Sequence, residues 1–222
     1  MRKIIVNAFI SLDGVMQAPG GPQEDPSGGF KLGGWSALCW DEIMGQTMEQ
    51  IRDRPYDLLL GRRTYEIFAA HWPYQKEEPI SEVFDRITKY VVATKPVDLS
   101  WQNSVLISGD VVAAIKELKS QPGPDLFVDG SSVLLQTLLA ENLVDELHTW
   151  TFPVTLGQGK KLFDGGTPSG HWKLINSVVA TTGVIIASLV PDGPVQTGTF
   201  EMGEISEREV TRREKFRQTG EL

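Results

Sequence analysis

Cysteine is nearly absent from this sequence. The only one, Cys39, has no partner for an internal disulfide, which fits a reducing cytoplasm. Long hydrophobic runs are also missing, because no window approaches the roughly 20 apolar residues of a membrane-spanning helix. The first run, Lys3 to Ile10, is interrupted by Asn7 and lacks a cleavage pattern, so it predicts a strand and not a signal peptide. We therefore expect a soluble, cytoplasmic protein with no membrane partner.

Basic clusters occur only near the end of the chain, and the formal net charge is −8. This balance argues against nucleic acid as a partner. No histidine, cysteine and carboxylate share metal-ligand spacing, so no metal is expected. With 222 residues and 41% hydrophobic composition, the chain can bury one good core. We expect one domain at 1–192 and a charged tail at 193–222, where Ser206 and Glu209 have capping-box spacing.

What the sequence does contain is an alternation of buried strands and helical patterns. After the first strand, strands are expected at 56–61, 89–94, 104–108, 125–129, 146–154, 172–180 and 183–190. Helices are expected at 40–52, 62–70, 110–119, 132–141 and about 206–217. The order predicts an α/β fold with a mixed, mostly parallel sheet, helices on both faces and an antiparallel C-terminal hairpin through "ATTG". The Gly/Pro-rich segment 14–34 is longer than usual connections, so it is either functional or disordered.

One strand-to-helix turn has an unusual composition. Asp129 ends the strand at 125–129, and Gly130, Ser131 and Ser132 precede the next helix. Ligands of open α/β sheets bind where strands end, and the first N–H groups of a helix favour anions such as a pyrophosphate. The alternative is a plain helix cap after a tight turn.

Two other strands end in similar groups, combining glycine or hydroxyl groups with cations. Arginines at a helix N-terminus oppose the helix dipole, so a bound anion would compensate for them. Surface arginines that only confer solubility are the alternative. A dinucleotide with a 2′-phosphate accounts for all three turns together. The residues are Gly61, Arg62, Arg63 and Thr64 after the second strand, and Thr94 and Lys95 after the third.

Longer motifs carry a family resemblance. The chain contains "NAFISLDGVM", "GRRTYE", "ATKP", "VDGSS" and "NLVDELHTWTFPVTLGQGKKLF", which cover roughly residues 2–190. Together they resemble the dihydrofolate reductase superfamily, in the branch similar to the reductase domain of the bifunctional riboflavin biosynthesis protein. The resemblance implies a dihydrofolate reductase-like fold, a homodimer and an NADPH-dependent reductase acting on a small heterocyclic or conjugated imine or carbonyl compound.

The resemblance also implies roles for individual residues. Arg62 and the pair Thr94 and Lys95 would meet the 2′-phosphate, with Arg63 sharing that role. Thr64 and the turn 130–132 would hold the pyrophosphate. The nicotinamide would be flanked by residues after the first strand, namely Ala8, Asp13 and Gly14.

The proton that accompanies hydride transfer needs a source, either a side chain or a water. Asp129 is one candidate, because the related riboflavin-type reductases carry a glutamate there, and loop bonding is its alternative. Asp41 corresponds roughly to the substrate-binding acid of dihydrofolate reductases, and a helix N-cap is its alternative. Asp13 is expected to be structural. Aromatic residues expected near a planar ligand are Phe30, Trp35, Trp40 and Trp72, of which one or two should contact it.

Two other functions stay open. The chain could be a non-catalytic NADPH-binding or regulatory module that keeps the phosphate turns. It could also be a structural homodimer whose late strands and tail pack against a partner. The substrate is open as well, and an unfused reductase is favoured because no deaminase domain or zinc motif is present.

Overall fold

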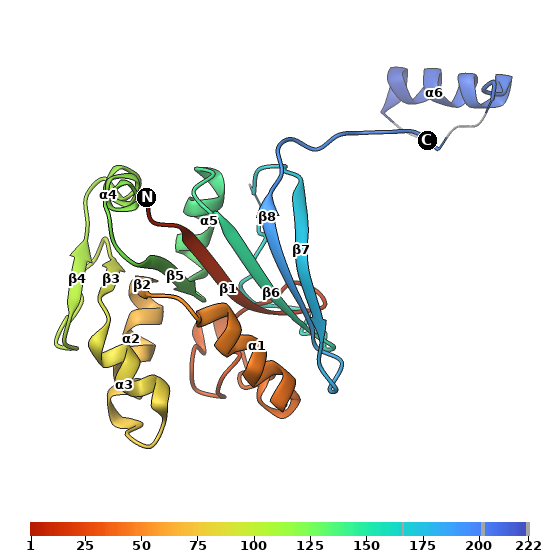
Figure 1. The fold of residues 1–222 in the computed structure, drawn as a ribbon. Coiled ribbons are helices and arrows are strands. Elements are labelled where there is room, and N and C mark those ends of the chain that lie inside the picture. The colour runs from red at the N-terminus through yellow and green to blue at the C-terminus, as the bar shows by residue number, and fades with distance from the viewer. Residues whose placement is uncertain (166, 201–202, 221–222) are drawn as a thin grey trace.

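The computed structural model describes residues 1–165, 167–200 and 203–220. In this part of the chain, eight strands form one sheet in the order β4-β3-β2-β5-β1-β6-β8-β7 (Figure 1). The strands are β1 Ile4–Ser11, β2 Tyr56–Gly61, β3 Lys89–Val92, β4 Ser104–Ile107, β5 Asp125–Asp129, β6 Glu146–Phe152, β7 Trp172–Val179 and β8 Ile185–Pro191. Strands β1 to β6 pair in parallel, whereas β8 pairs antiparallel with both β6 and β7. The predicted mixed sheet with its antiparallel end is confirmed.

The helices are α1 Glu42–Arg52, α2 Arg62–His71, α3 Pro79–Arg86, α4 Val111–Ser120, α5 Ser132–Ala140 and α6 Glu207–Thr219. All but α3 lie where the sequence predicts a helix, within one or two residues at each end. Helix α3 was not predicted, although Ile80, Val83, Phe84 and Ile87 recur at helical spacing; its eight residues are shorter than most helices. Pro79 nevertheless begins it at a position that suits proline.

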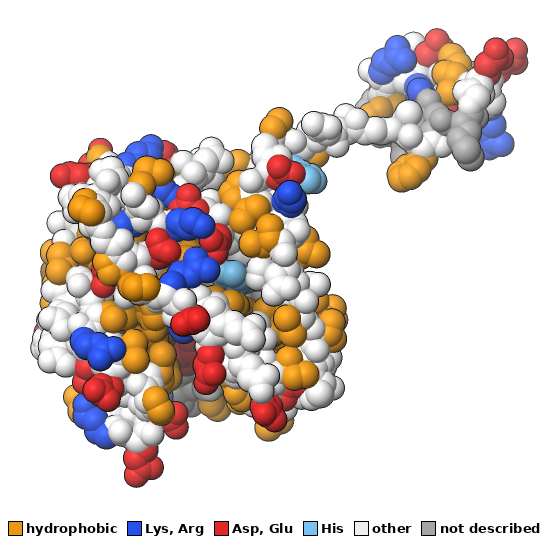
Figure 2. All heavy atoms as spheres, viewed as in Figure 1, with side chains coloured by type: hydrophobic (Ala, Val, Ile, Leu, Met, Phe, Trp, Pro, Cys, Tyr) orange, Lys and Arg blue, Asp and Glu red, His pale blue; other side chains and the backbone are white. Residues whose placement is uncertain are grey.

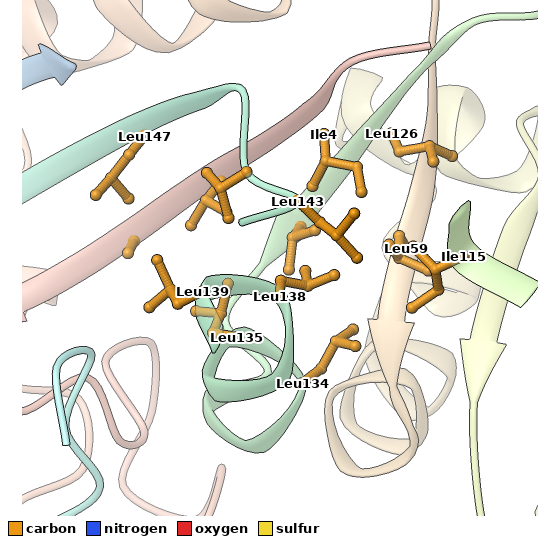
Figure 3. Close-up of a cluster of buried hydrophobic side chains, with 14 of the residues drawn as sticks. Ile4, Leu59, Ile115, Leu126, Leu134, Leu135, Leu138, Leu139, Leu143 and Leu147 are labelled. Atoms are coloured by element: carbon orange, nitrogen blue, oxygen red, sulfur yellow. The ribbon is translucent and has the colours of Figure 1, made fainter. Parts of the chain in front are cut away.

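Helices cover both faces of the sheet because successive strand residues point to opposite faces. On one face, leucines of α5 pack against Ile4, Leu59 and Leu126 of three strands (Figure 3). On the other face, Ile5, Leu58 and their neighbours pack against residues of α1, α2 and α3. Strands β8 and β7 lie at one end of the sheet, beyond the part that the helices cover (Figure 1).

The hairpin of β7 and β8 turns through residues 180–183, as the sequence predicts. Gly183 has φ +86°, a left-handed value that glycine adopts without a steric penalty. Beyond β8 the chain leaves the sheet and runs out to α6 (Figure 1). There Ser206 accepts a hydrogen bond from the Glu209 amide, as its capping-box spacing predicts, whereas the Glu209 carboxylate pairs with Arg212. Among the described residues, no helix is both long and apolar enough to cross a membrane.

Candidate functional site

The turns after β2, β3 and β5 open into one cleft at the carboxyl edge of the parallel strands. Its volume is about 2440 Å³. Because the three strands are parallel, the sequence predicts that their following turns meet at a common edge, and they do. From these turns the cleft is lined by Gly61, Arg62, Arg63, Thr64, Thr94, Lys95, Asp129, Gly130, Ser131 and Ser132.

Two helix N-termini converge in this cleft. Neither α2, after Gly61, nor α5, after Ser131, has a side chain that caps its first turn. Instead, the Ser131 hydroxyl accepts a hydrogen bond from the Gly61 amide at 2.9 Å and joins the two turns. Gly130 and Ser131 both have left-handed φ, +66° and +63°. A non-glycine residue in this region is strained, and such residues concentrate at functional sites.

The cations of the cleft are held in different ways. Arg62 binds both carboxylate oxygens of Glu66, one turn further along α2, at 2.6 and 2.8 Å. Arg63 donates to the Ser27 hydroxyl at 3.2 Å. Lys95 is exposed and has no ion pair in the described part of the chain. These contacts lie at or near the protein surface, so a stronger anion can replace them at small cost.

Asp129 lies at the base of the cleft and is buried. Its carboxylate accepts hydrogen bonds from Arg52 at 2.7 Å and from the Asn7 amide group at 3.3 Å. The register of β1 against β5 pairs Asn7 with Asp129, which puts both side chains on the face covered by α1. Asn7 in turn accepts a hydrogen bond from Trp150 at 2.6 Å. This hydrogen-bonded network thus holds the Asp129 carboxylate next to its counter-charge, Arg52.

Arg52, the last residue of α1, was not singled out by the sequence. An arginine in the last turn of a helix usually complements the helix dipole, so it gave no separate signal. Its guanidinium lies over the rings of Tyr56, Phe84 and Phe127, at 5.3 to 5.6 Å from their centroids. Its Nη1 atom is buried and has no hydrogen-bond partner among the described residues. An unpaired buried donor costs free energy that a bound acceptor would recover.

Aromatic rings form one wall beside Asn7. Trp40 is half exposed and stacks on Trp150, with 6.1 Å between centroids and 9° between planes. Trp40 and Trp72 line the cleft, together with Phe9. Phe30 and Trp35 are not among its lining residues. Phe30 is buried in a small cluster and Trp35 donates to a backbone carbonyl of the same loop, so neither closes over the cleft.

The long segment 14–34 is folded and forms another wall of the cleft. Lys160, from the loop after β6, bonds to the Asp25 carboxylate and to the Ser27 hydroxyl at 2.9 Å. Glu24 lines the cleft and accepts hydrogen bonds from two glycine amides. Burial raises the pKa of the Glu24 carboxyl. The sequence left open whether this segment is functional or disordered. In the structure it is ordered and forms a wall of the cleft.

Other predicted site residues lie outside the cleft lining. Asp41 caps α1 and also accepts hydrogen bonds from the amide and hydroxyl of Thr181, so its carboxylate serves the N-cap role. Ala8 points into the core on the opposite face of the sheet from Asn7. Gly14, with φ +81°, belongs to the turn of Asp13.

Asp13 fixes that turn to the loop after β6. Its carboxylate accepts hydrogen bonds from the Ser11 hydroxyl at 2.6 Å and from the amides of Leu156 and Gly157. The bonds from Ser11 and the two amides lower the pKa of Asp13 to about 2. These contacts give Asp13 the structural role that the sequence indicated.

With this geometry in place, comparison with known families gives a clear match. The sequence profile described as the RibD C-terminal domain matches residues 2–186. The chain belongs to the RibD C-terminal domain family. A relative is the uncharacterized protein YyaP of Bacillus subtilis (strain 168), 26% identical over 189 residues, which cover 83% of this chain and 92% of YyaP. The expected resemblance is confirmed.

Solved structures with the same fold include a putative riboflavin biosynthesis protein and a dihydrofolate reductase. A putative riboflavin biosynthesis protein from Shewanella sp. PV-4 is 22% identical with a TM-score of 0.59, covering 86% of this chain and 99% of that one. Dihydrofolate reductase from Enterococcus faecalis, complexed with NADP(H), is 14% identical with a TM-score of 0.54, covering 86% and 96%. The dihydrofolate reductase-like fold is thereby confirmed, and family membership supports a reductase type of function.

Proposed function

We propose that the protein is an NADPH-dependent reductase that transfers a hydride to a small heterocyclic or conjugated imine or carbonyl compound. The observation that carries the proposal is the junction of Gly61 and Ser131, where two uncapped helix N-termini face one cleft. Such a pair of positive helix ends is suited to a pyrophosphate. That a dihydrofolate reductase of the same fold was solved with NADP(H) supports the choice of cofactor.

In this proposal the cofactor phosphates use residues already in the cleft. Thr64 and the turn 130–132 hold the pyrophosphate through amides and hydroxyls. Arg62 exchanges Glu66 for the 2′-phosphate, with Arg63, Thr94 and Lys95 beside it. A phosphate carries more charge than a carboxylate and accepts two parallel bonds from a guanidinium, which favours that exchange.

The substrate end of the site is the network of Asp129, Arg52 and Asn7. When bound, the cofactor supplies the hydride. Asp129 accepts hydrogen bonds with both oxygens, so we assign it to orienting an N–H group of the substrate. The Arg52 guanidinium beside Asp129 suits a substrate oxygen or nitrogen that gains electron density during reduction. The accompanying proton then comes from a water, since Asp41 lies outside the cleft lining.

Cofactor titration tests the proposal. Quenching of tryptophan fluorescence should saturate with NADPH and be markedly weaker with NADH. Single-turnover oxidation of NADPH, followed at its absorbance band with a panel of pterins, flavin precursors and quinones, then tests for chemistry. Absence of any heat on mixing NADPH with the protein in a calorimeter would refute the cofactor assignment.

The alternative is a non-catalytic NADPH-binding or regulatory homodimeric module. The observation in its favour is the ion pair of Asp129 with Arg52, which engages the carboxylate that the sequence offered as a proton donor. The titration above would give the same result for this module. Turnover distinguishes the two, because the module would bind NADPH and oxidise none.

We also propose a homodimer that forms through β7 and β8. Exposed apolar residues on this hairpin are Leu174, Ile175, Val179 and Ile185, which are 49 to 64% exposed. Strand β7 is the edge of the sheet. An exposed apolar edge favours association with another chain.

We also propose a cytoplasmic location, because a reduced dinucleotide and the unpaired thiol of Cys39 both fit that setting.

A further inference from the structure

A second lobe of the cleft lies between α1 and α3, on the side of Arg52 away from the phosphate turns. Figure 2 shows the surface hollowed between the segments that carry these helices, with hydrophobic side chains on its wall. We call this lobe the α1/α3 slot. It is lined by Met48, Phe68, Trp72, Ile80, Val83 and Ile87, all half-buried.

We propose that the α1/α3 slot receives an uncharged, apolar substituent of the substrate, so that the substrate is a planar conjugated compound without a phosphate group. This inference rests on the proposed reductase function. The slot adjoins the substrate end of the site, because the Arg52 guanidinium pairs with Asp129 and lies 5.6 Å from the centroid of Phe84 in α3. A ring placed at Asp129 would therefore extend its substituent into the slot.

The walls of the slot match an apolar group. The Trp72 ring meets Phe84 edge-on at 5.4 Å between centroids, and Phe68 stacks on Phe84 at 5.9 Å. Aromatic and branched aliphatic side chains that stay half-buried gain free energy when an apolar ligand covers them. Each additional CH2 of substituent buried in such a place should tighten binding about fourfold.

The charged residues at the rim of the slot disfavour the binding of a phosphate. Glu49, Asp53 and Glu78 are exposed and line it, and a phosphate would bring nearly two more negative charges among them. Arg54 also lines the cleft, but its guanidinium lies 3.4 Å from Glu146 and is shared with Asp125. Arg86 is the remaining cation of the rim among the described residues.

The balance of charge at the rim therefore favours an uncharged group. At the phosphate turns, by contrast, Arg62, Arg63 and Lys95 face the same cleft, and Lys95 is exposed with no ion pair among the described residues. The two ends of the cleft are thus built for ligands of opposite character, a phosphorylated one at the turns and an apolar one at the slot.

Binding of two matched probes tests the inference. 1-Naphthol and 1-naphthyl phosphate share one bicyclic ring, and neither needs to be reduced. Ligand-observed NMR with NADPH present should give 1-naphthol an affinity about tenfold higher than its phosphate. Val83→Asp should weaken 1-naphthol by about tenfold, whereas Val105→Asp, on β4 outside the cleft, should not.

Far-UV circular dichroism and a cooperative thermal unfolding transition show whether the fold of each variant is intact. If Val83→Asp does not fold, two other measurements test the inference. They are the binding of 1-naphthol to Ile80→Ser and the comparison of the two probes on the unmodified protein. Equal or tighter binding of 1-naphthyl phosphate, weakened by Arg86→Gln, would overturn the inference, as would no binding of 1-naphthol. Failure of NADPH to bind, with 1-naphthol still selected over its phosphate, would reject the proposed function and leave the slot standing.

Discussion

The hydroxyl of Ser131 accepts the backbone N–H of Gly61 at 2.9 Å, across 70 residues of sequence. This bond joins the end of β2 to the start of α5 and holds two helix N-termini side by side. The left-handed backbone of Ser131, φ +63°, keeps the hydroxyl in that position. The arrangement proposed to bind phosphate thus depends on one hydroxyl.

Ser131→Ala should lower the free energy of unfolding by about 1 kcal/mol, because the Gly61 amide loses its partner. It should also weaken NADPH and NADH equally, since both carry the pyrophosphate. Chemical denaturation and cofactor titration measure the two effects. Ser120→Ala, at the exposed end of α4, is the control and should alter neither cofactor affinity. If Ser131→Ala weakened the binding of NADPH alone, Ser131 would be assigned to the 2′-phosphate and not to the pyrophosphate.

Arg62→Ala should weaken NADPH by about 1–3 kcal/mol and NADH much less, because only NADPH has the 2′-phosphate. Glu66→Gln should act in the opposite direction, since it frees Arg62 from its partner. The gain should be about twofold, on the scale of an exposed ion pair within a helix. Isothermal titration with both cofactors measures these shifts, and equal losses for NADPH and NADH in Arg62→Ala would count against the assignment.

Asp129→Asn should lower turnover while NADPH affinity stays near that of the unmodified protein. It should also lower the free energy of unfolding by about 3 kcal/mol, because Arg52 is left buried without its counter-charge. Adding Arg52→Gln should restore part of the stability without restoring turnover. Denaturant unfolding and steady-state kinetics separate the two effects. Unchanged turnover in Asp129→Asn would remove this residue from the mechanism.

Lys89 is fully buried and donates to the Phe84 carbonyl at 2.7 Å, at the end of α3. Burial lowers its pKa from 10.5 to about 8. Between these values the unfolded chain binds one more proton than the folded chain, so the free energy of unfolding should rise as pH increases from about 8 to 10.5. Subtracting the profile of Lys89→Met isolates this rise from other titrations. A flat difference would contradict the shift.

Val179→Asp, on the exposed side of β7, should convert a homodimer into monomers. A charge buried at an apolar interface lacks a partner there and opposes association. Sedimentation velocity measures the mass. Val133→Asp is a matched control, since Val133 is 78% exposed on α5, away from the hairpin. A monomeric unmodified protein at micromolar concentration would reject the proposed dimer.

The sequence by itself determined the alternation of strands and helices and the position of the three turns that we propose for the cofactor phosphates. Hydrophobic period and turn residues are local properties, and parallel strands necessarily end at one edge. This is why 61–64, 94–95 and 129–132 were predicted to share a rim and do share one. Helix α3 was missed although its apolar residues recur at helical spacing, because its eight residues are shorter than most helices.

Only the tertiary structure decided which charged groups meet. Arg52 reaches Asp129 across 77 residues, and the register of β1 on β5 brings Asn7 to the same carboxylate. Asp41, by contrast, is committed to its own helix and to Thr181. Local pattern fixes which face a residue occupies, but packing of distant elements fixes its partner. Pair contacts over such separations leave no trace in a single sequence, and they define the end of the cleft that we propose for the substrate.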